Sequence, residues 1–274
     1  MFRSVGLDRH VKFIALMFTA ATPALAVELS SPPGEHARTE ISVGAEYTSG
    51  NYGRATDTNI WYVPLTLRHG NERWYARLTI PWLRVEGSGD VVISSGGAKG
   101  AGRKSGTSTS TTTRAESGIG DVIAAAGYRL LTQTEVRPSL DLTGKVYFAT
   151  ADEAKGLGTG ENDYAAQLDL TKNAGDWILS GAGGYLVTGD PAGIDYKNVF
   201  YGWFDAGYRF DVLTIGAVIN AQQAIISAND GPAYLTGYVT NRLAEDVRLT
   251  TYLLRGLSDA SPDWGAGIVL TREF

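Results

Sequence analysis

Apolar and polar residues alternate along most of the chain with a period of two, the period of β-strands. In residues 40–48, for example, the apolar Ile41, Val43 and Tyr47 alternate with the polar Glu46 and Thr48. No segment shows the 3.6-residue period of an amphipathic helix. The alternation predicts twelve strands, at residues 38–49, 56–68, 73–86, 117–131, 138–149, 162–171, 176–187, 197–210, 212–224, 232–242, 247–256 and 262–274.

The connections between these segments alternate between short and long. The short ones lie at residues 70–72, 132–137, 172–175, 211 and 244–246, and the longest connection is 87–116. Strands of about 10–15 residues are long enough to cross a bilayer when tilted. Short periplasmic turns and longer extracellular loops are typical of bacterial outer-membrane barrels. We therefore predict an all-β fold, a single-chain antiparallel transmembrane β-barrel of about twelve strands over residues 38–274.

The aromatic residues of the apolar parity form two bands, as the lipid interfaces on both sides of a barrel favour. The strands of a secreted β-sandwich also alternate apolar and polar residues. A sandwich, however, requires neither an alternation of short and long loops nor aromatic residues gathered at two levels along the strands. The predicted outer band contains Tyr47, Trp82, Phe148, Tyr164, Tyr185, Phe200 and Trp264. The predicted periplasmic band contains Trp74, Tyr128, Trp177, Tyr208, Phe210 and Phe274.

The N-terminus has the pattern of a secretory signal peptide over residues 1–26. Basic residues come first, a short apolar stretch follows, and Ala24-Leu25-Ala26 supplies the small-x-small cleavage pattern. We expect residues 27–37 to be a periplasmic N-terminal segment. The terminal Phe274 closes the last alternating segment, where it resembles the signal read by the barrel-insertion machinery. These features predict export to the outer membrane of a Gram-negative bacterium.

The composition excludes several classes of function. The chain contains no Cys, so it has no disulfide framework and no thiolate metal site or nucleophile. Its net charge of −5 argues against a nucleic-acid partner, which requires a basic surface. No apolar run is long enough for a spanning helix. We expect no cofactor, and the sequence predicts no oligomeric state.

Three motifs point to a family. Residues 118–131 (GIGDVIAAAGYRLL), 155–164 (KGLGTGENDY) and 185–190 (YLVTGD) resemble segments of predicted outer-membrane transporters associated with the meta-cleavage pathway of phenol degradation. The resemblance is best over residues 117–210. It departs at residues 149–152, where Ala-Thr-Ala-Asp replaces the family's usual Pro-Thr-Gly-Asp. The resemblance implies a porin-like barrel that passes small, often hydrophobic or aromatic compounds.

Charged and aromatic residues of the polar parity are candidates for lining the lumen. They are Arg77, Asp121, Arg129, Asp141, Lys145, Asp169, Tyr201, Trp203, Asp205, Arg209 and Arg248. Arg129, Asp141, Asp169, Arg209 and Arg248 all fall near periplasmic strand ends. They form either a charged layer that narrows the periplasmic mouth or a set of ion pairs that only satisfies buried polar groups inside the barrel. The sequence leaves both alternatives open. A lining of tyrosines either passes an aromatic solute along or only packs the barrel.

The function predicted is passive uptake of small solutes, with the Gly-, Ser- and Thr-rich loop 87–116 as a mobile extracellular gate. The alternative is a plugged structural or surface-interaction barrel without transport. An outer-membrane hydrolase is disfavoured, because neither His36 nor His69 lies near the outer rim or pairs with Ser and Asp. The predicted partners are lipid, lipopolysaccharide, the insertion machinery and a small-molecule solute.

Overall fold

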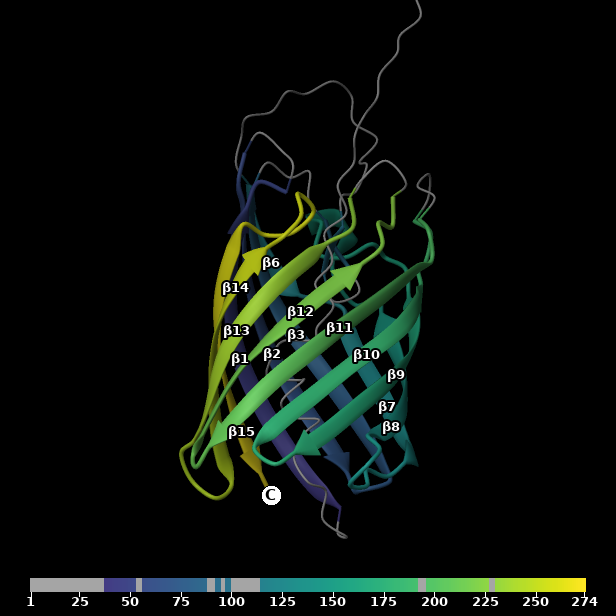
Figure 1. Ribbon diagram of the computed structural model, residues 1–274. Coiled ribbons are helices and arrows are strands. Elements are labelled where there is room, and N and C mark those ends of the chain that lie inside the picture. Colours follow the sequence, from purple (N-terminus) through teal and green to yellow (C-terminus); the bar gives the residue numbers. More distant parts are fainter. Residues whose placement is uncertain are drawn as a thin grey trace, which may run out of the picture.

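The computed structural model describes residues 37–52, 56–87, 92–94, 97–99, 114–191, 196–226 and 230–274. Most of these residues form one antiparallel sheet that closes into a barrel, with strongly tilted strands (Figure 1). The helical structure in the described ranges is one 3-10 turn, η1 (Glu153–Lys155). No helix in this part of the chain is long and apolar enough to cross a membrane. The predicted signal peptide and residues 27–36 lie outside the described residues.

The strands agree closely with the alternating segments of the sequence. The wall contains β1 (Arg38–Gly50), β2 (Thr58–Gly70), β3 (Trp74–Gly87), β6 (Arg114–Ile119), β7 (Val122–Leu131), β8 (Ser139–Phe148), β9 (Asp163–Ala174), β10 (Trp177–Val187), β11 (Val199–Phe210), β12 (Leu213–Gln222), β13 (Ala233–Arg242), β14 (Val247–Gly256) and β15 (Trp264–Glu273). Two short strands, β4 (Val92–Ser94) and β5 (Gly97–Lys99), form a separate hairpin.

The first and last strands close the barrel. β1 pairs with β15 from Glu40↔Glu273 to Ser49↔Trp264, and every other wall strand pairs antiparallel with its sequence neighbours. β6 and β7 both pair with β3, so they occupy one position in the wall. In the described residues the wall therefore has twelve positions, as the sequence predicted. Pairing of β1 with β15 closes the sheet, and closure removes the open sheet edges that lipid does not tolerate. At the long-loop end, the short β6 pairs with β3 alone among the described residues.

The predicted strand 117–131 contains a β-bulge that the alternation alone did not reveal. Ile119 of β6 pairs with Trp82, whereas Ile123 of β7 pairs with Thr79, so one extra residue stands between the two registers. Gly120 donates its N–H to the Pro81 carbonyl at 2.9 Å. A Cβ at Gly120 would lie 2.6 Å from Leu83 Cδ1, so any larger residue in the bulge would displace the buried Leu83 side chain. The extra residue turns Asp121 toward the interior.

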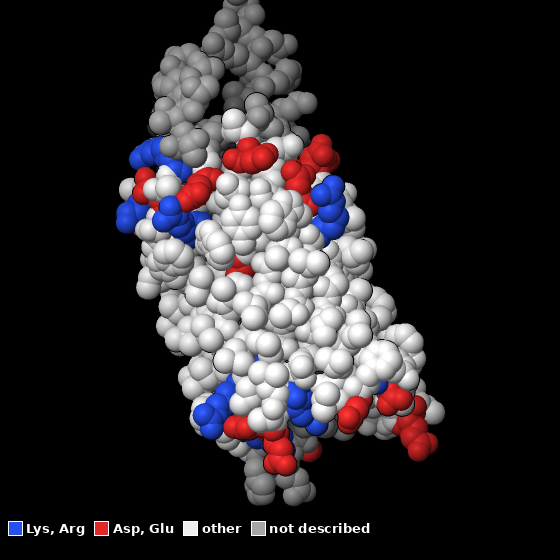
Figure 2. Space-filling model, turned by 90° about the vertical axis from the view of Figure 1, so that its left-hand side faces the viewer, with Lys and Arg blue, Asp and Glu red and all other residues white. Residues whose placement is uncertain are grey.

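The outer surface carries an apolar belt between two charged ends. Figure 2 shows this belt in white, with Lys, Arg, Asp and Glu gathered above and below it. Large apolar side chains of the outward parity are exposed in the belt, among them Leu65, Leu168 and Phe204. Exposed apolar surface of this extent is costly in water and favourable in lipid. The fold is thus a transmembrane β-barrel.

The predicted aromatic bands lie on this outer surface. In the band near the long connections, the Tyr47 ring centroid lies 5.1 Å from Trp61 and 5.5 Å from Trp264. At the opposite end, Tyr208 lies 5.1 Å from Trp177 and 4.6 Å from Phe210. The remaining members of both bands are exposed on the same parity. Side chains of this kind anchor a barrel at the two lipid interfaces.

Tight hairpins join the strands at one end of the barrel, the lower end in Figure 1. The side chain of Asn71 accepts hydrogen bonds from the N–H groups of Arg73 and Trp74, which closes the turn between β2 and β3. Asp211, in the turn between β11 and β12, adopts a positive φ of 50°. His69 lies within β2 rather than in the turn where the sequence placed it, because the strand continues to Gly70.

We expect a charge in the middle of the apolar belt to destabilise the barrel. Leu168→Arg places a guanidinium on the lipid-facing side of β9, which should lower the free energy of unfolding in lipid vesicles by about 2–4 kcal/mol. Val136→Arg, in a fully exposed turn, is the matched control and should leave it unchanged. Equal effects of the two substitutions would show that the belt does not face lipid.

Candidate functional site: the barrel lumen

Tyrosines on the inner wall lie opposite glycines on the neighbouring strand. The register pairs are Tyr75↔Gly127, Tyr201↔Gly184, Tyr238↔Gly216 and Tyr252↔Gly267. At each of these glycines, an added Cβ would overlap the ring of the paired tyrosine. The rings therefore lie flat against the wall, over the strand that carries the glycine, and do not cross the lumen.

Each of these tyrosines also reaches a hydrogen-bond partner on the strand beyond its glycine. The Tyr201 hydroxyl donates to Gln167 Oε1 at 2.9 Å, and that of Tyr252 donates to Glu46 Oε2 at 2.6 Å. The remaining bonds are Tyr75 to Thr143 Oγ1, at 2.9 Å, and Tyr238 to Asp205 Oδ2, at 3.4 Å. We call each arrangement of tyrosine, glycine and distant partner a tyrosine bridge. A bridge ties three strands together.

Charged side chains gather inside the barrel at the short-turn end. Arg129 binds Asp141 through two hydrogen bonds, of 2.7 and 2.9 Å. Arg248 donates to Glu40 Oε1 at 2.9 Å, and Arg209 donates to Asn173 Oδ1 at 2.9 Å. The predicted charged layer is therefore present, and two of its arginines are paired with carboxylates.

Two further members of this layer, Glu40 and Arg68, were not among the predicted lumen residues. Glu40 and Arg68 have the inward parity of β1 and β2 and lie 3.5 Å apart. Glu40 is almost fully buried and also binds Arg248. The Arg68 guanidinium carbon stacks 4.8 Å from the centroid of Tyr75. The layer thus extends around the wall from β14 to β3.

A second polar network lies deeper in the lumen, around Gln167. Its Oε1 accepts hydrogen bonds from Lys145 Nζ at 2.7 Å and from the Tyr201 hydroxyl, and its amide nitrogen donates to Asp169. Asp169 also accepts a 2.7 Å bond from the Thr143 hydroxyl. Asp169 thus joins the Lys145 network rather than an ion pair of the charged layer.

Further polar atoms inside the wall have no hydrogen-bond partner among the described residues. They are Asp205 Oδ1, both side-chain atoms of the Asn220 amide, Ser180 Oγ and Thr236 Oγ1, on β10 to β13. Trp203, opposite Asn220 in the register, packs with Val218 and Tyr238 beside them. Buried polar groups of this kind are where water or a polar solute binds.

Asp121 lies at the opposite, long-loop end, where it holds a connection across the mouth. Its Oδ1 accepts a hydrogen bond from the N–H of Ala151 at 3.1 Å. Thr150 Oγ1 accepts from the Val122 N–H and donates to the Gly120 carbonyl. We call residues 149–162, between β8 and β9, the mouth loop. The GIGD bulge therefore anchors the mouth loop to the wall.

The mouth loop turns inward. Leu157 is completely buried in a cluster with Tyr52, Ile60, Leu83 and Ala151. Gly156 ends η1 with a φ of 74°, and Gly160 has a φ of 77°, conformations that favour glycine. An apolar residue between glycines in an otherwise polar loop is the signal in the sequence that could have revealed this insertion.

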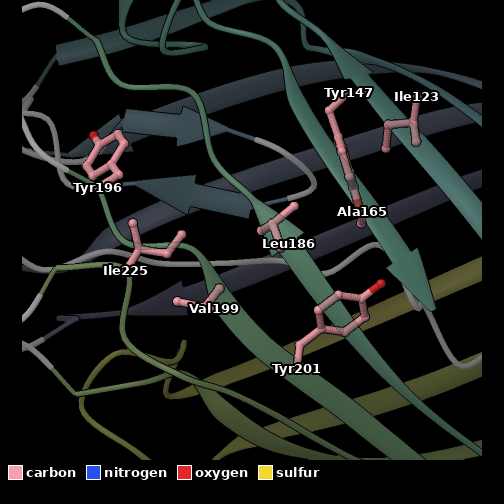
Figure 3. Close-up of a cluster of buried hydrophobic side chains, with 8 residues drawn as sticks. All are labelled: Ile123, Tyr147, Ala165, Leu186, Tyr196, Val199, Tyr201 and Ile225. Carbon is pink, nitrogen blue, oxygen red and sulfur yellow. The ribbon is translucent and has the colours of Figure 1, made fainter. Parts of the chain in front are cut away.

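The other long connections add apolar side chains to the same end. Tyr196 and Ile225, from the connections after β10 and β12, pack on Leu186, Val199 and neighbouring wall residues, as Figure 3 shows. Burial raises the pKa of Tyr196 to about 12, so its hydroxyl stays protonated. The described part of the long-loop end therefore contains two clusters of buried apolar side chains.

The three motifs that carry the family resemblance meet here. The Asp163 side chain, in the second motif, accepts a 2.7 Å hydrogen bond from the N–H of Gly189 in the third. Asn162 Oδ1 accepts from the Ala149 N–H at 2.8 Å, and Gly158 lies against Asp121 of the first motif. The motifs thus build and anchor the mouth loop.

All eleven predicted lumen residues lie on the inner side of the wall, but they do not form one site. Arg129, Asp141, Arg209 and Arg248 belong to the charged layer, and Lys145, Asp169 and Tyr201 belong to the Gln167 network. Trp203 and Asp205 line β11, Arg77 projects from β3, and Asp121 holds the mouth loop. The side chains of loop 87–113 lie outside the described residues.

The described part of the chain contains no group of His, Asp and Glu side chains that could hold a metal ion. His69 lies on the outer side of β2, its ring 5.8 Å from that of Trp74, and its Nδ1 forms a 2.9 Å hydrogen bond with Thr39 Oγ1. It belongs to the aromatic band rather than to the lumen. His36 lies outside the described residues.

A closed antiparallel wall, apolar outside and lined with polar groups inside, defines the class of transmembrane β-barrel proteins. Within that class, the model of the family described as "Putative MetA-pathway of phenol degradation" matches residues 34–271, and the chain belongs to this family. No curated protein matches the chain.

The chain is similar to several solved structures, of which the first shares its fold. An outer membrane channel from Pseudomonas putida F1 is similar with a TM-score of 0.67 and 14% identity, over 89% of this chain and 97% of that one. The β-domain of the Bordetella autotransporter BrkA is similar with a TM-score of 0.45 and 14% identity, over 86% and 98% of the two chains. The monoaromatic hydrocarbon channel CymD gives a TM-score of 0.42 and 9% identity, over 94% and 93%.

Adjacent glycines on β10 test the tyrosine bridges. Gly184→Ala should push the Tyr201 ring off the wall and lower the free energy of unfolding by about 1–3 kcal/mol, measured in denaturant. Gly183→Ala is the matched control, because its Cβ would point outward into open space and should change stability by less than about 0.5 kcal/mol. Equal stabilities for the two variants would contradict the bridge.

Asp121→Ala tests the anchor of the mouth loop. The variant loses the bond to Ala151, so trypsin should cleave after the exposed Lys155 faster than in the unaltered protein. Asp259→Ala removes another carboxylate at the long-loop end and serves as the control. Unchanged cleavage in Asp121→Ala would show that other contacts of the mouth loop suffice to hold it.

Proposed function

We propose that the protein is an outer-membrane channel for the passive uptake of small molecules, including hydrophobic and aromatic ones. The observation that carries this proposal is the contrast between the apolar belt and an interior lined with tyrosine, arginine and carboxylate side chains. Tyrosine bridges that hold their rings against the wall keep the lumen clear, as transport requires. The family's association with phenol degradation and the channel from Pseudomonas putida support the same function.

The path we propose runs from the long loops to the short turns. A solute passes the mouth loop, moves along tyrosine rings and hydroxyls that offer stacking and hydrogen bonds, and leaves through the charged layer. We propose that residues 1–26 direct export, that residues 27–37 remain in the periplasm, and that Phe274 serves barrel insertion. Loop 87–116 is a second gate beside the mouth loop in this scheme, and the long-loop end contacts lipopolysaccharide.

The main alternative is a plugged barrel whose loops serve a structural or surface function. The apolar clusters around Leu157 and Ile225 favour it, because they occupy the long-loop end. We infer transport rather than catalysis, because His69 lies on the outer side of β2 and forms its hydrogen bond with Thr39, away from the charged residues of the lumen.

Planar-bilayer conductance tests the channel. We expect discrete steps from the mature protein, Val27 to Phe274, and larger or more frequent steps from a variant that lacks residues 90–114. Steps in the variant alone would make loop 87–116 a closed gate. If neither protein gives conductance steps, the result would contradict the proposed channel and support the plugged barrel.

A further inference from the structure

Two cationic side chains face the lumen at the same level of the wall with only a methyl group between them. Arg77 of β3 pairs in register with Ala125 of β7, and Ala125 pairs with Lys145 of β8. Neighbouring strands are about 4.8 Å apart, so the two cationic residues start about 10 Å apart. Because Ala125 is small, the wall position between Arg77 and Lys145 carries only a methyl group.

Neither cation forms an ion pair with a described residue, unlike its neighbours. Arg68, Arg129 and Arg248 all contact carboxylates, whereas Arg77 has no hydrogen-bond or ion-pair partner in the described part of the chain. Lys145 donates only to the neutral amide oxygen of Gln167 and lies 5.4 Å from the centroid of Tyr201. The positive charge of the pair is thus not neutralised by direct contact.

The carboxylates nearest to this pair are engaged elsewhere. Asp169 accepts hydrogen bonds from Thr143 and Gln167, and its charge acts on Lys145 without a direct hydrogen bond or ion pair between the two. Glu46 binds the Tyr252 hydroxyl. Gln167 therefore orients Lys145 without cancelling its charge, which leaves the ammonium available to an anion.

Aromatic rings surround the two cations. The charge of Arg77 acts on the hydroxyls of Tyr62, Tyr75, Tyr147 and Tyr201, which come from four different strands. The Tyr62 hydroxyl is buried and has no hydrogen-bond partner among the described residues. Flat rings and a free hydroxyl beside two cations suit a ligand that combines an aromatic ring with an anionic group.

We propose that Arg77 and Lys145 form a binding site in the lumen for the anion of an aromatic acid. The carboxylate lies between the guanidinium and the ammonium, and the ring packs among the tyrosines. The proposal rests on the proposed function only in treating the bound acid as cargo. It names an aromatic carboxylate, rather than a neutral hydrocarbon, as a preferred solute.

Calorimetric titration of the detergent-purified protein with benzoate and with benzamide tests this site. The two probes have nearly the same shape and differ in charge. We expect benzoate to bind at least about tenfold more tightly, and Arg77→Gln and Lys145→Gln each to weaken benzoate binding by about tenfold or more. Lys145→Arg should retain the preference for benzoate. Arg255→Gln, on the outer side of β14, is the matched control and should have no effect.

Equal affinities for benzoate and benzamide would overturn the proposal, as would full benzoate binding by both glutamine variants. The heat-modifiable mobility of each variant on a gel confirms that its barrel is folded. Conductance is measured separately on the same samples. Conductance steps together with equal binding of benzoate and benzamide would overturn the proposed binding site but not the proposed channel. Preferential binding of benzoate without conductance steps would overturn the channel but not the binding site.

Discussion

Closure of β1 on β15 is the constraint on which the rest of the structure depends. In lipid, an unpaired strand edge would leave a row of N–H and C=O groups without partners, so the sheet must close. Once it closes, each strand has one inner and one outer parity, and a shift by a single residue would exchange them. The apolar belt, the aromatic bands and the polar lumen all follow from that one register. The bulge at Gly120 is one of the places where the chain changes this register, and Asp121 turns inward as a result.

A closed wall of this size creates a second problem, because its inner side chains must be packed without blocking the centre. Twelve strands lie between the eight of a filled barrel and the sixteen or more of a water-filled porin. The tyrosine bridges resolve this tension. Each tyrosine ring occupies the space that a larger side chain in place of the paired glycine would have filled. The ring thus packs against the glycine and stays out of the centre of the lumen. The hydroxyl then satisfies a partner two strands away, such as Gln167 or Glu46, which couples packing to the polar network.

The sequence predicts the architecture far better than the contacts inside it. Strand parity is a local property, so Trp74 and Tyr75 are assigned to opposite sides from the pattern alone, and the structure agrees. Which inward side chains bind one another depends on the register between strands, and some of these strands are distant in sequence. No local pattern of residues encodes that register. The sequence therefore placed Asp141 and Asp169 in one charged layer, whereas Arg129 holds the first and Thr143 and Gln167 hold the second. Leu157 was overlooked for the same reason, because its partners Ile60 and Leu83 lie far away along the chain.

The polar residues of the family motifs hold the mouth, and the two cations of the proposed anion site lie outside the motifs. Asp121, Asn162 and Asp163 are engaged in anchoring residues 149–162 and the neighbouring connection, so their side chains are occupied by backbone N–H groups. Arg77 lies outside the stretch that carries the resemblance, and Lys145 lies between its motifs. The mouth loop and the two cations of the proposed anion site are thus held by different side chains of this chain.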